Sequence, residues 1–223
     1  MGGKDLIADV FAGREPARPP YVPLLGRVAH VLGQVDATAF VTDPQVQAVA
    51  LAETAGALGA DVVTVGMGTD PAVGVQVVER LRPLLAGRGV AACLAEPDVA
   101  GVRAYCDAGV DMVVLVEPDR SAASRFKTIA NACGFYQAGA VLADPSLEDG
   151  ARVAADLGLH GAIVAHPRGD EPGVVGGGLD ASHLGGAPPV CPRPAGFFWS
   201  FASEVDPGAS PEALAALGTV LTG

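Results

Sequence analysis

Four apolar runs in the middle of the chain each end in a polar side chain that is followed at once by proline. The runs cover residues 90–97, 112–118, 140–145 and 162–167. Each is short and rich in small or β-branched residues, which is typical of a buried parallel strand. Because proline has no N–H to donate to a neighbouring strand, it marks the place where each strand ends. The polar residues expected at these four strand ends are Glu96, Glu117, Asp144 and His166.

A second repeated pattern predicts helices between the strands. In three places, beginning at Leu58, Ala108 and Leu157, a helical stretch ends at a glycine and a new apolar run follows. Glycine there is the usual left-handed residue that ends a helix. Strands are expected at residues 21–25, 61–66, 90–96, 111–117, 139–144 and 161–166. This alternation predicts an α/β fold with parallel strands. A (β/α)8-like TIM barrel is favoured over an open dinucleotide-binding sheet, because no Gly-x-Gly-x-x-Gly follows the first strand.

The regular alternation stops after His166. Residues 168–194 are dominated by glycine and proline, so we expect an irregular segment there. Its triplet at 176–178 is either a flexible loop or a backbone cradle for phosphate. One last strand near 197–200 and one last helix near 211–221 complete the expectation of a barrel that is shortened or irregular after its sixth strand. An incomplete barrel has an open edge, and we expect a homodimer to cover it.

Length and composition limit the classes of protein. The 223 residues suit a single barrel domain over 1–223, and a hydrophobic content of 50% supports a large core. No apolar stretch approaches the roughly 20 residues needed to span a bilayer, so no membrane partner is expected. The start of the chain has no charged and then apolar signal region, which favours a cytoplasmic protein. A net charge of −11 with no basic run argues against nucleic acid as a partner.

The four strand-end residues are candidates for catalysis, since chemistry in such barrels takes place at the carboxyl-terminal rim. Crowded carboxylates raise one another's pKa, which would make one of them a general acid. Glu117, Asp144 and His166 are also candidate ligands for a divalent metal ion. Asp-Pro and Glu-Pro pairs have a structural alternative, because the acid can cap the next helix and proline can occupy its first position. Histidine is a poor cap, so that alternative is weakest for His166.

Both ends of the chain resemble the uroporphyrinogen decarboxylase superfamily, which includes corrinoid-linked and thiol methyltransferases. Residues 5–20 are similar to the family's first helix and its Gly-x-x-x-Asp-Arg-x-Pro approach to the first strand. Residues 196–212 are similar to its last strand and the Pro-Pro-Glu-Asn start of its last helix. The resemblance implies a (β/α)-barrel enzyme, a small-molecule substrate and, for the methyltransferase branch, a corrinoid or other partner protein.

The chain departs from this family at the chemical positions. The decarboxylases have an Arg-Gln-Ala-Gly-Arg segment where this chain keeps one cation, Arg27. The methyltransferases use His-x-Cys and a later Cys as zinc ligands, whereas this chain has Arg168 after His166-Pro167 and Ser203 in the last motif. Serine is a weak zinc ligand, so we expect that the family's zinc site is not intact. Ser203 joins the candidate catalytic residues, and Arg27 and Arg168 are the candidates for binding a substrate carboxylate.

Three functions remain open from the sequence. The first is methyl-group transfer involving a small carboxylate- or thiol-bearing substrate, which the opening segment favours. The second is decarboxylation of a small substrate, which needs a cationic pocket that Arg27, Arg168 and Arg193 would supply. The third is a non-catalytic barrel that binds a ligand or a partner subunit.

Overall fold

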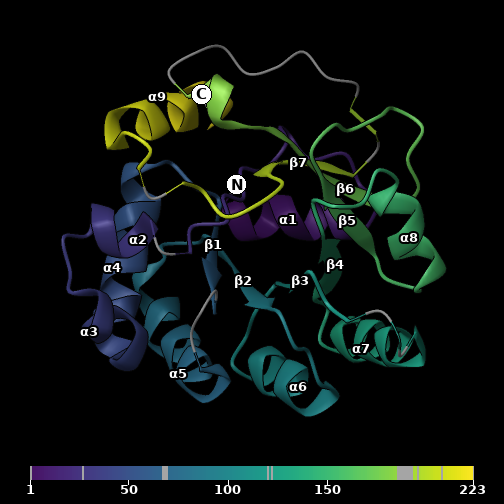
Figure 1. Ribbon diagram of the computed structural model, residues 1–223, viewed down its shortest axis with the longest axis horizontal. Helices are drawn as coiled ribbons and strands as arrows, with labels where there is room; N and C mark the ends of the chain where they lie inside the picture. The colour runs from purple at the N-terminus through teal and green to yellow at the C-terminus, as the bar shows by residue number, and fades with distance from the viewer. Residues whose placement is uncertain are drawn as a thin grey trace.

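The computed structural model describes residues 2–26, 28–66, 70–119, 121, 123–184, 193, 194, 196–206 and 208–222. Seven strands form one sheet, all parallel and in the order of the chain. They are β1 (Val62–Val65), β2 (Gly89–Leu94), β3 (Met112–Val116), β4 (Gly139–Ala143), β5 (Gly161–Val164), β6 (Val174–Leu179) and β7 (Phe197–Phe201). The sheet curls into a ring (Figure 1), which confirms an α/β barrel-like architecture. None of the described helices is long and apolar enough to cross a membrane.

Residues 20–25, which include the expected first strand at 21–25, lie between β7 and β1 and hydrogen bond to both. The N–H of Trp199 donates to the Pro20 carbonyl at 2.8 Å, and the N–H of Asp61 donates to the Tyr21 carbonyl at 2.9 Å. Tyr21 and Trp199 form a single parallel bridge. Proline at 20 and 23 removes N–H donors, so a regular ladder cannot form. This segment, called the closing segment below, covers the edge that was expected to be open. The argument for a dimer over that edge is therefore wrong, and a homodimer stays a prediction.

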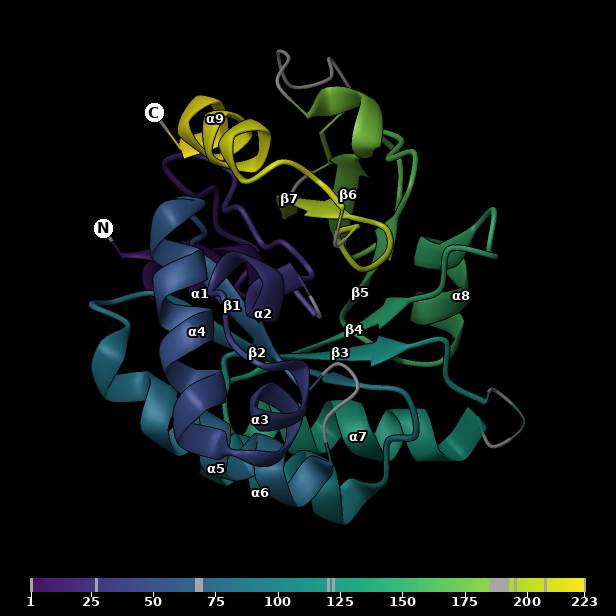
Figure 2. The same ribbon diagram turned by 60° about the vertical axis from the view of Figure 1, so that its left-hand side comes forward.

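Helices surround the ring on its outer side (Figure 2). They are α2 (Val28–Leu32), α3 (Ala37–Thr42), α4 (Pro44–Ala57), α5 (Pro71–Leu81), α6 (Val99–Asp107), α7 (Ala123–Phe135), α8 (Gly150–Asp156) and α9 (Pro211–Thr222), with short 3-10 turns η1 (Arg82–Leu84) and η2 (Ala181–His183). Asp43 and Asp70 accept hydrogen bonds from the first turns of α4 and α5, and each is followed by proline. These starts follow the pattern of an acidic cap with proline at the first helical position.

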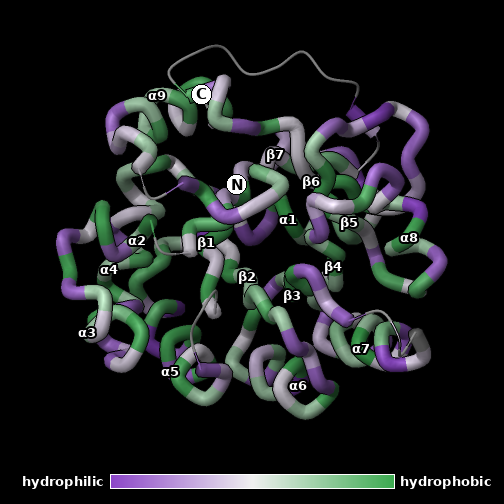
Figure 3. The backbone as a smooth tube through the Cα atoms, viewed as in Figure 1, coloured by the Kyte–Doolittle hydropathy of each residue, from purple (hydrophilic) through white to green (hydrophobic). Residues whose placement is uncertain are grey.

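The remaining helix, α1 (Gly3–Phe11), lies in the middle of the ring of strands in Figure 1. The N–H of Lys4 donates to the Gly87 carbonyl just before β2, which places α1 across the amino-terminal mouth of the barrel. Its buried Ile7 and Val10 join the core inside the barrel, together with residues such as Met112 and Val141. A larger core separates the strands from the outer helices. In Figure 3 the strands are mostly hydrophobic, while hydrophilic residues gather on the outer helices and loops.

The glycine triplet is part of β6, so the expected flexible loop at 176–178 is wrong, and the alternative of a phosphate cradle stays a prediction. A Cβ on Gly176 would collide with the ring of Phe198 on β7, which packs inside the barrel. Glycine is thus required where a large aromatic side chain lies directly on the neighbouring strand. The segment expected to be irregular also contains η2. Its residues 185–192 lie outside the described residues.

The repeated pattern before β1, β3 and β5 has a structural role at the amino-terminal ends of the strands. Asp61 accepts a hydrogen bond from the N–H of Tyr21, Asp111 from that of Val90, and His160 from that of Ala140. In each case the side chain that starts one strand holds the backbone of the preceding strand or closing segment. Asp61 also forms a two-pronged ion pair with Arg18, with N–O distances of 2.7 and 2.9 Å.

Candidate active site at the carboxyl-terminal rim

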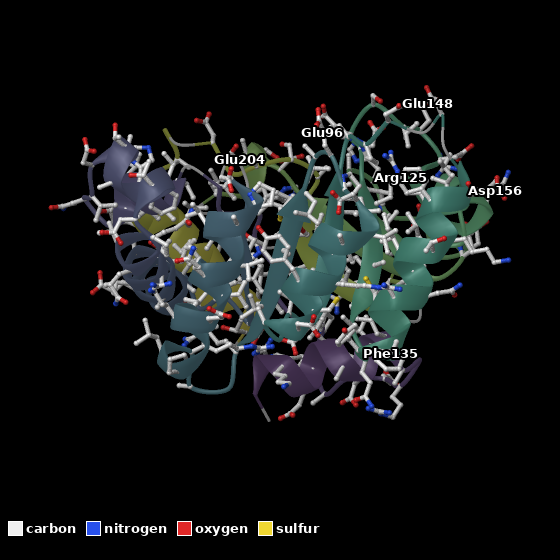
Figure 4. All side chains as sticks on the ribbon, turned by 90° about the horizontal axis from the view of Figure 1, so that it is seen from below. Glu96, Arg125, Phe135, Glu148, Asp156 and Glu204 are labelled. Atoms are coloured by element: carbon white, nitrogen blue, oxygen red, sulfur yellow. The ribbon has the colours of Figure 1, made fainter. Side chains whose placement is uncertain are left out.

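The four predicted rim residues follow the carboxyl ends of β2, β3, β4 and β5, and therefore lie at the same end of the barrel. Glu96, Glu117 and His166 are exposed, whereas Asp144 is buried. In Figure 4 the labelled Glu96 and Glu204 lie at this rim, and Phe135 lies at the opposite end near α1. The structure thus places the residues at the predicted end, but it does not gather them into one cluster.

Local structure accounts for Asp144. Its carboxylate accepts hydrogen bonds from the N–H of Ser146 at 3.1 Å and from the Ser146 hydroxyl at 2.5 Å. This is an acidic side chain that stabilises its own turn, as in the capping alternative. Glu96 has no such role, because Asp98 caps α6.

Glu117 has an unusual backbone conformation. Its φ is +43°, in the left-handed region that non-glycine residues seldom occupy, while its N–H donates to the Ala143 carbonyl at 2.9 Å. The hydrogen bond to β4 holds the chain in this conformation as it leaves β3. Strained residues of this kind often lie at functional sites.

A hollow of about 300 Å³ opens between the ends of β5, β6 and β7. It is lined by Ala165, His166, Leu179, Asp180, Ala181, Leu184 and residues 201–206. His166 and Ser203 are therefore brought together in one depression, although they are 37 positions apart in the sequence. The volume is at the lower end of the range of roughly 300–1,000 Å³ for small-molecule sites.

Three carboxylates that sequence reasoning missed also line this hollow, namely Asp180, Glu204 and Asp206. Asp180 directly follows β6, the strand that was expected to be an irregular loop, so its place at the rim was hidden. The hydroxyl and the N–H of Ser182 hold the pKa of Asp180 below its usual value. Asp180 is consequently ionised at neutral pH. Glu204 and Asp206 directly follow β7, within the same sequence motif as Ser203. Their closeness to Ser203 in the sequence could have identified them as residues of the site.

Glu204 extends from the end of β7 toward the closing segment. Its carboxyl group lies over Gly26, whose φ is +42°, and a Cβ on Gly26 would collide with it. Burial, together with the Glu204 carboxylate, raises the pKa of the Cys93 thiol to about 12. Cys93 thus stays protonated at neutral pH and is a poor nucleophile.

The predicted metal ligands are not grouped together, and Arg168 does not reach the hollow. Across the described part of the chain, no three His, Cys, Asp or Glu side chains are grouped so that they could hold a metal ion, so Glu117, Asp144 and His166 are not assembled as the predicted set. Arg27 lies outside the described residues. Arg168 is exposed, pairs with Asp149 at 3.1 Å, and does not line the hollow.

Comparison with known proteins supports the fold of this chain but does not assign it to a protein family. No family model matches the sequence, and no curated protein matches it. Solved structures do match. One is a 3-hexulose-6-phosphate synthase with a TM-score of 0.53 and 18% identity, covering 76% of this chain and 93% of that one. The neighbours are TIM-barrel enzymes. This protein has their fold.

Two further structures have the same TM-score of 0.53 and cover 79% of this chain. The 3-keto-L-gulonate-6-phosphate decarboxylase from Vibrio cholerae is 16% identical and covered over 92% of its length. The 3-hexulose-6-phosphate synthase from Salmonella typhimurium is 13% identical and covered over 93%. At these identities only the fold is shared. They do not single out the uroporphyrinogen decarboxylase superfamily, so that resemblance stays a prediction.

Proposed function

We propose that this protein is an enzyme that transfers a methyl group from a positively charged small-molecule donor bound in the hollow between β5, β6 and β7. The observation that carries the proposal is the charge of the lining. Asp180, Glu204 and Asp206 contribute three carboxylates, and none of the described lining residues is Lys or Arg. Such a lining favours a cation and disfavours an anionic substrate.

Methyl donors of the sulfonium and quaternary ammonium classes carry this charge. On transfer, the bond from the methyl carbon to the donor sulfur or nitrogen breaks, and its electron pair stays on the donor, which becomes neutral. The methyl carbon forms its new bond to a thiol sulfur of the acceptor. The thiol proton goes to His166, whose exposed imidazole lines the hollow.

The carboxylates and His166 have different roles in this scheme. The positive charge of the donor is already dispersing in the transition state, so the carboxylates contribute mainly to donor binding. His166 removes the proton from the thiol of the acceptor, which makes the sulfur more nucleophilic. His166 therefore acts in the chemical step. Ser203 lines the same hollow, and in this scheme its hydroxyl donates a hydrogen bond to the bound substrate.

Decarboxylation of a small carboxylated substrate is the second candidate, because one structural neighbour is named as a decarboxylase. That support is at the level of the fold. It needs cations at the hollow, whereas Arg168 is paired elsewhere and Arg193 lies at the opposite end of the barrel. A barrel that binds a ligand without catalysis is the third candidate.

Donor binding can be tested by calorimetry with choline and its neutral isostere 3,3-dimethylbutan-1-ol. We expect choline to bind more tightly by at least about tenfold. Asp206→Asn should remove most of this preference, and the matched control Glu96→Gln, at a rim position outside the hollow, should keep it. Equal binding of the two probes would contradict the proposal.

The reaction can be tested by incubating the protein with sulfonium and quaternary ammonium donors and small thiols, with mass spectrometry of the methylated thiol. We expect His166→Gln to lower the turnover rate by about 10²–10⁴-fold, the usual contribution of a general base, while choline affinity is kept. Release of CO₂ from small carboxylates without methyl transfer would favour the second candidate. Choline binding with neither reaction would favour the third.

A further inference from the structure

A second and larger cavity lies at the amino-terminal end of the barrel, away from the proposed active site. Its volume is about 540 Å³. It is formed by the segment that follows α1, residues 13–19, and by the start of β7 with Arg193 and Pro194 before it. Because β7 runs from this end to the rim, its two ends separate the two cavities by the length of the strand.

The lining of this cavity is basic in a strongly acidic protein. Arg14, Arg18 and Arg193 line it, and Glu15 is the one acid among the described lining residues. The chain as a whole has 25 acidic and 14 basic residues. Three of those basic residues therefore meet at one cavity, whereas the hollow at the rim is lined by acids.

The three arginines differ in how their charge is used. Arg18 is held by Asp61 in the two-pronged ion pair, and Arg14 pairs with Asp9 at 2.6 Å. Arg193 is exposed and pairs with no carboxylate in the described part of the chain. Its guanidinium carbon lies 5.0 Å from the centre of the Trp199 ring. Contact with an aromatic face positions a guanidinium and leaves the N–H groups in its plane available.

We propose that this cavity binds a small organic anion, with a phosphate or carboxylate group held by Arg193 and an apolar part against Pro16, Pro194 and Phe197. A guanidinium binds such groups through two parallel hydrogen bonds, which lysine cannot reproduce. The charges of Arg14 and Arg18 are offset by Asp9 and Asp61, so among the described lining residues Arg193 supplies the uncompensated positive charge of the cavity. The site is separate from the rim hollow, and this inference does not depend on the proposed methyl transfer.

Trp199 provides a direct readout, because it is the single tryptophan of the chain and lies under Arg193. We would titrate the full-length protein with inorganic phosphate, phenyl phosphate and benzoate, and follow tryptophan emission and the heat of binding. We expect saturable binding, tighter for phenyl phosphate than for inorganic phosphate because of the apolar wall. Comparing the titrations with inorganic phosphate and with benzoate shows whether the cavity prefers a phosphate or a carboxylate group.

Variants decide whether Arg193 holds the anion. Arg193→Ala should weaken phenyl phosphate binding at least about tenfold by calorimetry, Arg193→Lys should weaken it less, and Glu15→Gln should strengthen it. Arg168→Ala, an exposed arginine at the other end of the barrel, is the matched control and should change nothing. The absence of saturable binding, or equal binding by Arg193→Ala that keeps the wild-type circular dichroism spectrum, would overturn the proposal.

Discussion

At the scale of single residues, His160 is the clearest case of a side chain whose chemistry the fold constrains. Its Nδ1 accepts the N–H of Ala140 at 2.9 Å, which requires the neutral form of the ring at that nitrogen. Burial lowers the pKa of His160. The same position before β1 and β3 is occupied by Asp61 and Asp111, which accept the equivalent hydrogen bond through a side-chain oxygen.

The first prediction concerns this hydrogen bond. His160→Leu leaves the buried N–H of Ala140 without an acceptor and should lower the free energy of unfolding by about 1–3 kcal/mol. His160→Asn supplies a side-chain carbonyl acceptor and should lower it less. Urea denaturation of the three proteins measures the order, and a leucine variant as stable as the wild type would contradict it.

The second prediction is the pH dependence that follows. The folded-state pKa of His160 lies below the unfolded value of about 6.5, so the unfolded chain takes up the proton more readily. The stabilising contribution of neutral His160 is complete above about pH 6.5 and declines as the pH falls through the lower folded-state pKa. Thermal melts between about pH 4.5 and 7.5 should therefore show a smaller loss of stability for His160→Asn than for the wild type.

At the scale of elements, the closing segment is held by side chains as well as by backbone hydrogen bonds. The Thr64 hydroxyl accepts the N–H of Leu25 at 2.9 Å and donates to the Pro23 carbonyl at 3.1 Å. The Ser200 hydroxyl donates to the Val22 carbonyl at 2.8 Å from the other side. Two buried hydroxyl groups thus supplement the backbone hydrogen bonds that hold the segment to β1 and β7.

The third prediction concerns the ion pair at the start of this segment. Asp61→Asn removes the charge that partners the partly buried Arg18 and should cost about 2–3 kcal/mol of stability, less than the 3–5 kcal/mol of a fully buried pair. The control Asp9→Asn breaks the more exposed pair with Arg14 and should cost no more than about 1 kcal/mol. Equal effects in chemical denaturation would show that the Arg18 pair is no stronger than a surface pair.

The fourth prediction concerns β6. Gly176→Ala inserts a methyl group against the Phe198 ring and should destabilise the protein by about 1–3 kcal/mol or more. Phe198→Leu in the same chain should recover part of this loss by making space. Gly134→Ala, on an exposed part of α7 with open space around it, is the control and should stabilise by about 0.5–1 kcal/mol. Thermal or urea denaturation of these variants gives the comparison.

Strands β2 to β5 were predictable because each is a short apolar run between a glycine and a proline. The same local reasoning failed for β6, whose Val174 to Leu179 contains three glycines and looks like a loop. The contact with Phe198 explains Gly176, and at Gly177 a Cβ would collide with the Val164 carbonyl on β5. A pattern within one segment does not contain this tertiary information. For the same reason the sequence predicted only some of the residues that line the hollow at the rim. Asp180 was missed because it follows β6.

At the scale of the whole molecule, charge is distributed unevenly between the two cavities. The hollow over β5, β6 and β7 is acidic, and the cavity beside residues 13–19 is basic. Composition predicted the acidic character of the chain, but not this division, because residues distant in sequence supply both linings. An excess of carboxylates also makes the folded state repel itself at low ionic strength.

The fifth prediction follows from this excess. Raising the sodium chloride concentration from about 0.01 M to 0.15 M shortens the screening length from about 30 to 8 Å and should raise the melting temperature at pH 7.5. The two-pronged Arg18–Asp61 pair is partly buried and is screened less than exposed charges. A melting temperature that falls over this range would show that exposed ion pairs outweigh the repulsion.

The closing segment also has a consequence for the order in which the chain is synthesised. The hydrogen bond from Ser200 to Val22 joins residues 178 positions apart. A growing chain therefore exposes the segment long before β7 leaves the ribosome, and contacts of such separation form late in folding. Prolines at 19, 20 and 23 leave few N–H groups for a foreign strand to pair with. The residues that prevent a regular eighth strand thus protect the nascent chain from aggregation while it waits for its partner.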